Sequence, residues 1–242
     1  MLHEPNVAAV AALIADPARA AMLAALLDGR ALPAGELAYA SGVTAQTASS
    51  HLSKLLAGGL LSVETEGRHR YYRLAGPHVA QALEHLSTIL PAVPARRKFL
   101  TSEQKELRFA RRCYDHLAGQ LGVAVAQCLE RRKFIVALPR KRFEVTPNGA
   151  SWLAGIGLDL STLKPSPHGL ARQCLDWTER LHHVGGPLGV ELTRVLCANG
   201  WLRRSRQSRA MRITPKGYAE LKRHLGIDAQ RLHEQGLEDE AA

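Results

Sequence analysis

The chain has 242 residues, 46% of them hydrophobic and 5% aromatic, and its formal net charge is +10 at pH 7. It holds no run of about 18 apolar residues, and its N-terminus lacks the charged start and apolar core of a signal peptide. We therefore expect a cytoplasmic protein with no membrane partner. Its length and apolar content predict a globular fold of one large or two small domains. The cysteines, Cys113, Cys128, Cys174 and Cys197, lack CxxC spacing, which argues against a disulfide scaffold or a zinc ribbon.

The first 95 residues predict five helices and one hairpin. Asp16 and Thr44 are suited to cap helices that begin at the next residue, Pro17 fits a first helical position, and Gly29 and Gly42 are suited to end helices. Two short strand-like runs flank a polar turn and predict the hairpin. Helices are expected over residues 7–15, 17–27, 34–41, 45–57 and 78–90, and strands over residues 61–65 and 70–74.

The helix expected after Thr44 carries a weakly helix-forming polar face. Solvated helix faces usually contain Glu and Lys, whereas this face is rich in hydroxyl groups. Its polar residues are Thr47, Ser49, Ser50, His51 and Ser53. The order of helices and hairpin is that of a winged helix-turn-helix domain, in which this helix lies in the major groove and its hydroxyl groups meet base edges. The alternative is that the hydroxyl groups only solvate a helix end.

The chain resembles the ArsR group of bacterial winged-helix transcriptional regulators in three successive motifs, "DPARAAMLAALLDG", "ELAYASGVTAQTASSHLSKLLAGGLL" and "EGRHRYYRL". The resemblance covers about residues 6–92. It implies a cytoplasmic homodimer, paired through its first and fifth helices, that occupies a palindromic double-stranded DNA operator and leaves it when an inducer or metal binds. The residues that it assigns to DNA, in the helix and in the wing, are Thr44, Gln46, Thr47, Ser49, Ser50, His51, Lys54, Arg68, His69 and Arg70.

The best-known effector sites of that group do not match this sequence. The group's thiolate site lies in the third helix as a Cys-x-Cys pattern, whereas residues 36–40 contain no sulfur. The group's zinc site in the fifth helix needs more ligands than His78, Glu84 and His85 provide here. Two histidines on such a helix are more often plain polar residues, so we place no metal at either position.

The second half of the sequence repeats itself. Residues 115–123 match residues 182–190 at an offset of 67, and residues 145–153 match residues 213–221 at 68, which indicates a duplicated unit of about 67 residues. Each copy predicts a helix, two short strands and a second helix, a degenerate winged-helix-like layout. The copies are expected over about residues 102–160 and 170–228, with a long helix over 102–116, strands over 134–137, 143–145, 201–204 and 211–213, and helix caps at Thr146 and Thr214.

Most of the basic charge lies in this second half. Residues 1–95 hold six Lys or Arg and seven Asp or Glu, whereas residues 96–242 hold 26 and 15. A positive surplus favours a polyanionic partner, nucleic acid before membrane. The surplus is therefore outside the segment that we expect to read DNA.

Glycines in the two copies would let their helices meet at a seam rich in reactive side chains. Within each of the pairs Cys113 with His116 and Glu179 with His182, a separation of three residues would place both side chains on one helix face. Such a seam suits a small-molecule effector pocket or a metal site with thiolate and imidazole donors. The alternative is structural histidines, because His116 and His183 occupy equivalent positions. The candidate ligands are Cys113, Asp115, His116, Cys174, Asp176, Trp177, Glu179, His182 and His183, whereas Cys128 and Cys197 are expected in the core.

Together these patterns predict a mainly α protein with short β-hairpins (α+β). It would have a winged helix-turn-helix domain over residues 1–95 and a duplicated sensing domain over residues 96–242. The predicted function is a sequence-specific transcriptional regulator, a repressor released from its operator by an effector, and not an enzyme. One alternative is a thiol-dependent enzyme with Cys174 as nucleophile and His182 or His183 as base. Another is an architectural DNA binder without an effector.

Overall fold

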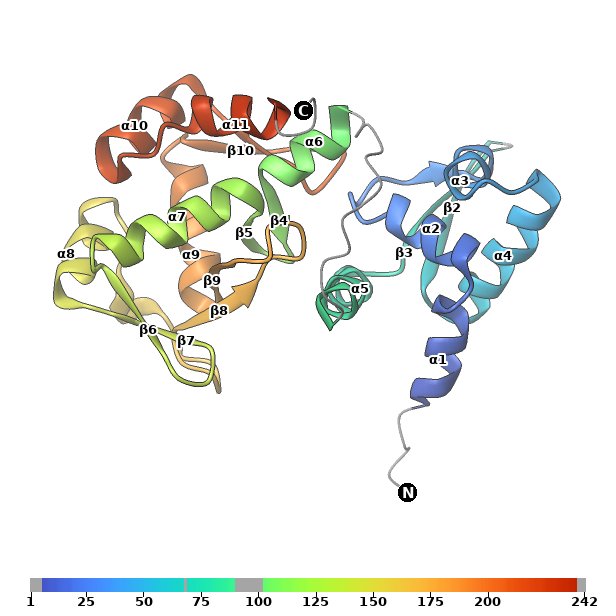
Figure 1. Cartoon of the computed structure of the whole chain (residues 1–242), viewed down its shortest axis with the longest axis horizontal. Coiled ribbons are helices and arrows are strands. Elements are labelled where there is room, and N and C mark those ends of the chain that lie inside the picture. The colour runs from blue at the N-terminus through green and yellow to red at the C-terminus, as the bar shows by residue number, and fades with distance from the viewer. Residues whose placement is uncertain (1–5, 68, 90–101, 239–242) are drawn as a thin grey trace. The chain divides into compact units, whose positions relative to one another are not determined.

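The structure is a computed structural model, and it describes residues 6–67, 69–89 and 102–238. The chain divides into two compact units, Met1–Leu83 and Glu84–Ala242. Figure 1 shows the elements of each unit. The boundary predicted between residues 95 and 96 lies outside the described residues.

The five predicted helices and the hairpin occur in the predicted order, each end within two residues of its predicted place. A two-residue strand, β1, was not predicted; it pairs with β3 in an antiparallel sheet of order β1-β3-β2. The elements are α1 (Val7–Ile14), α2 (Pro17–Ala25), β1 (Leu32–Pro33), α3 (Ala34–Ser41), α4 (Ala45–Ala57), β2 (Leu61–Glu66), β3 (His69–Leu74) and α5 (Pro77–Ile89), which crosses the boundary between the units.

One apolar stripe fixes the orientation of α4 in the first unit. Ala48, Leu52 and Leu55 are buried on one side of this helix and belong to the same core cluster as Met22 and Leu23 of α2. Residues spaced by three and four lie on one helix face, so the opposite side of α4 is left exposed. The core of the first unit therefore determines which polar side chains α4 presents to solvent.

The second unit is built from helices and short antiparallel hairpins. Its strands form a four-stranded sheet of order β6-β7-β8-β9 and two-stranded sheets β4-β5 and β10-β11. The elements are α6 (Ser102–Phe109), β4 (Arg111–Cys113), β5 (His116–Ala118), α7 (Gly119–Arg131), β6 (Ile135–Leu138), β7 (Arg142–Val145), α8 (Pro147–Gly155), the 3-10 helix η1 (Leu160–Thr162), β8 (Ala171–Leu175), β9 (His182–Gly185), α9 (Gly186–Ala198), β10 (Leu202–Arg204), β11 (Met211–Ile213), α10 (Pro215–Leu225) and α11 (Ala229–Glu238).

The helix caps predicted for this unit are confirmed. The Thr146 hydroxyl accepts a hydrogen bond from the Gly149 N–H (3.0 Å), and the Thr214 hydroxyl accepts one from the Gly217 N–H (2.9 Å).

Among the described residues, no single helix is both long and apolar enough to cross a membrane; α1 and α2, bent by 86°, pass that test only as a pair.

The helical prediction for the histidine-bearing segments is wrong. The helix expected over residues 102–116 ends at Phe109, and His116 and His183 lie on strands β5 and β9. The helices that follow begin at Gly119 and Gly186, whose φ angles of 79° and 75° are outside the right-handed helical region. A helix therefore cannot run through these glycines from the preceding segment.

Two glycines let α7 and α9 pack closely on these strands rather than on each other. A Cβ at Gly189 would lie 2.1 Å from the Val184 carbonyl oxygen and 3.3 Å from the Cβ of His116. A Cβ at Gly122 would lie 2.7 Å from the Leu117 carbonyl oxygen. Helix α7 contacts β9 and helix α9 contacts β5, so each helix supports the other histidine-bearing strand.

Candidate functional site

The exposed face of α4 carries five of the ten side chains predicted to contact DNA. Gln46, Thr47, Ser49, Ser50 and Lys54 are all exposed, opposite the buried stripe of this helix. The capping residue Thr44 is exposed as well, and its hydroxyl accepts a hydrogen bond from the Thr47 N–H (3.2 Å). The face thus offers hydroxyl, amide and ammonium groups to a partner.

His51 does not belong to that face. Its ring is half-buried beside the start of α2, where Nδ1 lies 3.4 Å from Nη1 of Arg19 and Nε2 lies 3.9 Å from Oδ1 of Asp16. The structure therefore corrects the placement of His51 on the exposed face, because polar groups 32 or more residues earlier in the chain hold the imidazole against the unit. Its contact with DNA stays a prediction.

The β2–β3 hairpin forms the predicted wing. His69 and Arg70 are exposed on β3, opposite Glu66 and Thr65 in the strand register. Further along the hairpin, Nη2 of Arg73 donates to Oε2 of Glu64 at 2.6 Å. The predicted contact Arg68 lies outside the described residues.

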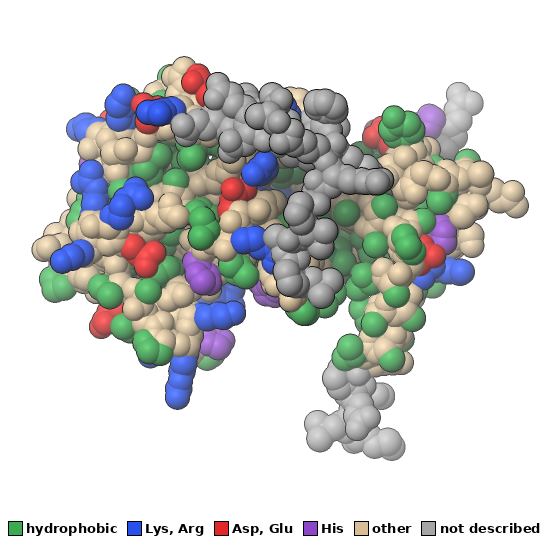
Figure 2. Space-filling model, viewed as in Figure 1, with side chains coloured by type: hydrophobic (Ala, Val, Ile, Leu, Met, Phe, Trp, Pro, Cys, Tyr) green, Lys and Arg blue, Asp and Glu red, His purple; other side chains and the backbone are tan. Residues whose placement is uncertain are grey.

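Helices α1 and α5 both expose large apolar side chains. In α1, where no residue is buried, Val7 is 68% exposed and Val10 is 44% exposed. In α5, Leu86 is 47% exposed and Ile89 is 72% exposed. Figure 2 shows hydrophobic side chains along α1. Exposed apolar surface on adjacent turns marks a surface that a partner can cover.

In the second unit, two cysteines and two histidines converge in the interior. Hairpin β4–β5 pairs Cys113 with His116, and strands β8 and β9 pair Cys174 with His183. Directly opposed residues of antiparallel strands project from the same face, so each strand pair offers one thiol and one imidazole together. Their ligand atoms all lie within 4.8 Å of one another. The exposed fractions are 6%, 3%, 4% and 1% for Cys113, His116, Cys174 and His183.

Both histidine rings place Nδ1 near a carboxylate and Nε2 toward the other ring. Nδ1 of His116 lies 3.1 Å from Oδ1 of Asp115, and Nδ1 of His183 lies 3.6 Å from Oδ2 of Asp176. Both Nε2 atoms point inward and are 3.1 Å apart, and the sulfurs of Cys113 and Cys174 are 4.0 Å apart. We name these four residues, Cys113, His116, Cys174 and His183, the thiol–imidazole cluster.

Hydrogen bonds within and beside the cluster shift the pKa values of three of its four side chains. Burial disfavours the charged ring of His116, but hydrogen bonds to Asp115 and Cys113 outweigh it and raise its pKa to about 9. The pKa of Cys113 rises to about 12 because of its hydrogen bond to Cys174 and its burial. The same hydrogen bond lowers the pKa of Cys174. Cys174 is therefore the more acidic thiol of the cluster.

The carboxylate of Asp176 is fully enclosed and fully paired. Nη2 of Arg111 donates to Oδ1 at 2.8 Å, and the Gly119 N–H donates to Oδ2 at 2.7 Å. Oδ1 also accepts from the backbone N–H and hydroxyl of Thr178 and from the Glu179 N–H. Burial acts to raise the pKa of Asp176, but Arg111 and these hydrogen bonds outweigh it and hold the pKa well below its usual range.

The other candidate ligands from the sequence lie outside the thiol–imidazole cluster. Glu179 pairs with Arg108 (3.2 Å), and the Trp177 ring lies 5.2 Å from Cζ of Arg111. His182 is half-buried on β9 beside His183. The expectation that these spacings form helix faces is wrong, because the segments are strands and turns.

The cysteines expected in the core behave differently from each other. Cys128 is buried and its thiol donates to the Leu225 carbonyl oxygen at 2.6 Å, whereas Cys197 is half-buried.

Sequence reasoning missed Arg111, which is buried and pairs with Asp176, 65 positions further along the chain. No local pattern around residue 111 signals that pairing.

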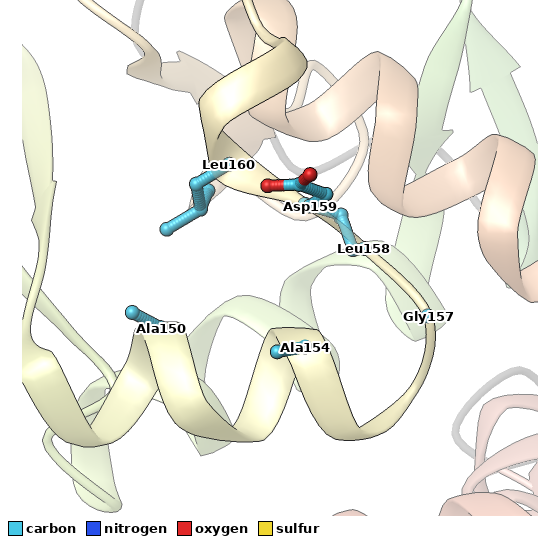
Figure 3. A pocket seen from close by; sticks show the side chains of 6 residues that line it. All are labelled: Ala150, Ala154, Gly157, Leu158, Asp159 and Leu160. Carbon is cyan, nitrogen blue, oxygen red and sulfur yellow. The ribbon is translucent and has the colours of Figure 1, made fainter.

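A shallow pocket of about 370 Å³ between α8 and η1 is a weaker candidate site (Figure 3). Its walls are mostly aliphatic, and the carboxylate of Asp159 already accepts hydrogen bonds from the N–H and hydroxyl of Ser161. The pocket therefore offers a ligand little polar recognition.

Comparison with known proteins decides the family. A protein-family model described as a helix-turn-helix domain matches residues 14–64. The HTH-type transcriptional regulator YdfF of Bacillus subtilis is 42% identical over 223 residues, which is 92% of this chain and 98% of that protein. The chain belongs to the ArsR family of winged helix-turn-helix transcriptional regulators. Because the likeness to YdfF spans nearly the whole chain, it includes much of the additional C-terminal region.

Other relatives of this ArsR-family regulator match a little over a third of the chain. The HTH-type transcriptional regulator CmtR of Mycobacterium tuberculosis is 41% identical over 92 residues, 38% of this chain and 77% of that protein. The solution structure of the cadmium metal-sensor CMTR from Mycobacterium tuberculosis covers 39% of this chain and 98% of its own, at 39% identity and a TM-score of 0.31. A homodimeric winged helix-turn-helix domain from Mycobacterium bovis covers 37% and 89%, at 30% identity and a TM-score of 0.33.

The buried ion pair of this ArsR-family regulator should be important for stability. We expect Arg111→Met to lower the free energy of unfolding by about 3–5 kcal/mol, because it leaves the Asp176 carboxylate buried without its cation. Urea denaturation followed by circular dichroism measures the loss. Arg194→Met, which breaks an exposed pair with Glu191 in the same unit, is the control and should unfold like the wild type. Equal effects of both substitutions would contradict the prediction.

Proposed function

We propose that this regulator is a sequence-specific repressor that binds a palindromic DNA operator as a homodimer and releases it when an effector binds. The exposed α4 face carries the proposal, because its hydroxyl and amide groups are poor helix formers but good partners for base edges. Membership of a family of transcriptional regulators supports the same conclusion.

The proposed DNA contacts are of two kinds: reading contacts, made to base edges, and positioning contacts, made to phosphates. Gln46, Thr47, Ser49 and Ser50 would meet base edges from the exposed side of α4. Phosphates would be held by Lys54 in the same helix and by the wing, where His69 and Arg70 are exposed. Thr44 would act at the helix end, where its hydroxyl already fixes the first turn.

Pairing of two copies through α1 and α5 would explain the exposed apolar side chains of both helices. A helix with no buried residue gains little from its own unit, so α1 in particular needs a partner surface. A twofold dimer would place two α4 helices at successive major grooves, about 34 Å apart. Operator affinity would then depend on the spacing of these helices.

The C-terminal region would carry the sensing role, and we propose that it is a duplicated unit. Helices α7 and α9 both contain 13 residues and follow histidine-bearing strands, and both are followed by a hairpin and a threonine-capped helix. An effector in this region would act on operator affinity through α5, the helix shared by both units.

A thiol-dependent enzyme is disfavoured by the burial of its candidate nucleophile. Cys174 and His183 lie together in the thiol–imidazole cluster, where both side chains are enclosed. Nucleophilic catalysis requires that a substrate reach the sulfur, and among the described residues the Cys174 side chain is only 4% exposed. His182, the other candidate base, lies outside the cluster.

Reading and positioning contacts should respond differently to substitution. With an operator selected from a random DNA library, we expect Gln46→Ala to weaken operator binding about 5- to 150-fold while leaving random DNA unaffected, because a base contact discriminates by about 1–3 kcal/mol. Arg70→Ala should weaken binding to both DNAs and reduce the slope of log affinity against log salt by about 0.9. Fluorescence anisotropy over a salt series measures both effects.

The control for these variants is Arg194→Ala, which removes one positive charge from an exposed site in the other unit. It should leave the operator preference intact. If Gln46→Ala and Arg70→Ala instead weakened operator and random DNA by the same factors, α4 would not be the reading helix.

A charge placed on the α1 surface should prevent dimer formation. We expect Val10→Asp to convert the protein to a monomer in light scattering after gel filtration, because dimerisation would bury the new carboxylate without a partner. Operator affinity should fall in parallel. Val136→Asp places the same charge on an exposed valine of β6 and should remain dimeric. A dimeric Val10→Asp variant would exclude α1 from the interface.

A further inference from the structure

The orientation of the two histidines in the thiol–imidazole cluster calls for a positive charge between them. Nδ1 of His116 lies 3.1 Å from the Asp115 carboxylate, and Nδ1 of His183, which has no hydrogen-bond partner among the described residues, lies 3.6 Å from the Asp176 carboxylate. A nearby carboxylate favours the tautomer with the proton on Nδ1. When both rings are neutral with the proton on Nδ1, each Nε2 presents a lone pair, and the two nitrogens face each other at 3.1 Å in a buried site. Two lone pairs at this distance repel unless a proton or a metal cation lies between them.

The sulfur–sulfur and nitrogen–nitrogen distances in the cluster are close to two edges of one tetrahedral coordination sphere. Zinc binds sulfur at about 2.3 Å and nitrogen at about 2.0–2.1 Å, so a regular tetrahedron has edges of about 3.8 Å between sulfurs and about 3.3 Å between nitrogens. The corresponding distances here are 4.0 Å between Cys113 and Cys174 and 3.1 Å between His116 and His183. A disulfide would instead need sulfurs about 2.05 Å apart.

We propose that Cys113, His116, Cys174 and His183 bind one tetrahedral zinc-class ion that fastens hairpin β4–β5 to strands β8 and β9. Two sulfur and two nitrogen donors in a tetrahedron are the ligand set of zinc, whereas magnesium and calcium require oxygen donors. This metal site goes beyond the DNA-binding function and stands without it.

The charges of the site balance when the ion is bound. Two thiolates neutralise a divalent cation, so the buried centre carries no net charge. The charge of the neighbouring Asp176 carboxylate is already balanced by Arg111, and its oxygens accept hydrogen bonds from the Gly119 N–H and the Thr178 hydroxyl. Asp176 can therefore orient His183 without adding an unpaired charge to the metal centre.

The site is closed, which assigns the ion a structural role. Protein side chains supply all four ligands, and all four are buried. A Cβ at Gly185 would lie 3.2 Å from Nε2 of His116 and 3.1 Å from the Cβ of Cys174, so the backbone at Gly185 packs directly against two of the ligands. Structural zinc sites have this closed form, and they add their binding energy to folding.

The test is metal analysis of the full chain purified under reducing conditions. We expect about one zinc per chain for the wild type, and loss of that zinc in Cys174→Ser and in His183→Ala. Matched controls replace the same residue types outside the cluster: Cys197→Ser, and His182→Ala on the same strand as His183. Both controls should keep the zinc, which separates a defined site from surface binding.

A second measurement uses only the wild-type chain, in case the ligand variants do not fold. The zinc is removed with a chelator and Co2+ is titrated back. One equivalent should produce the intense visible bands of tetrahedral cobalt together with thiolate-to-cobalt charge transfer, and should restore a thermal midpoint lowered by chelation. A metal-free wild type with an unchanged midpoint, a weak octahedral cobalt spectrum, or zinc retained in folded Cys174→Ser and His183→Ala would each overturn the proposal. Operator binding does not enter either readout.

Discussion

The second unit depends on the enclosure of one carboxylate, that of Asp176. A buried charge is tolerated only when its partners replace the water that it has lost. Here Arg111 from β4 and the N–H of Gly119 at the start of α7 meet the carboxylate, together with the turn that follows it. The same carboxylate lies beside Nδ1 of His183. One group thus connects the β4–β5 hairpin, α7 and the β8–β9 pair, and it orients a ring of the thiol–imidazole cluster.

The first unit could be predicted almost completely because its signals are local. Caps such as Thr44, the left-handed Gly42 and the apolar spacing of α4 each act within a few residues, and the structure contains each of them. The exceptions depend on distant partners. β1 is a strand only because β3 pairs with it, and His51 is turned inward by Asp16 and Arg19. Neither partner is visible in the sequence around the residue.

In the second unit, the sequence predicted all four residues of the thiol–imidazole cluster as candidate ligands, although it placed the histidine-bearing segments on helices and the structure places all four residues on strands. A separation of three between Cys113 and His116 fits one face of a helix, but it also fits opposite positions in a tight hairpin. The chemistry of the pair is the same in both cases. Cys174 and His183 are nine residues apart, and only strand register brings them opposite each other. The Arg111 to Asp176 pair has no local signal at all, so the sequence could not predict how the cluster is supported.

The positive charge of this regulator lies mostly outside the helix that we propose to contact base edges. The net charge is −1 over residues 1–95 and +11 over residues 96–242, and Figure 2 shows Lys and Arg side chains spread over the second unit. A positive field raises the local concentration of any polyanion but does not distinguish one base sequence from another. A nearly neutral helix face such as that of α4 would have the opposite property, because hydroxyl and amide groups gain little from phosphate charge and depend on matched donors and acceptors. If α4 reads the operator as proposed, selectivity would come from its short polar side chains, and the basic C-terminal unit would add sequence-independent attraction to the phosphate contacts proposed for Lys54, His69 and Arg70.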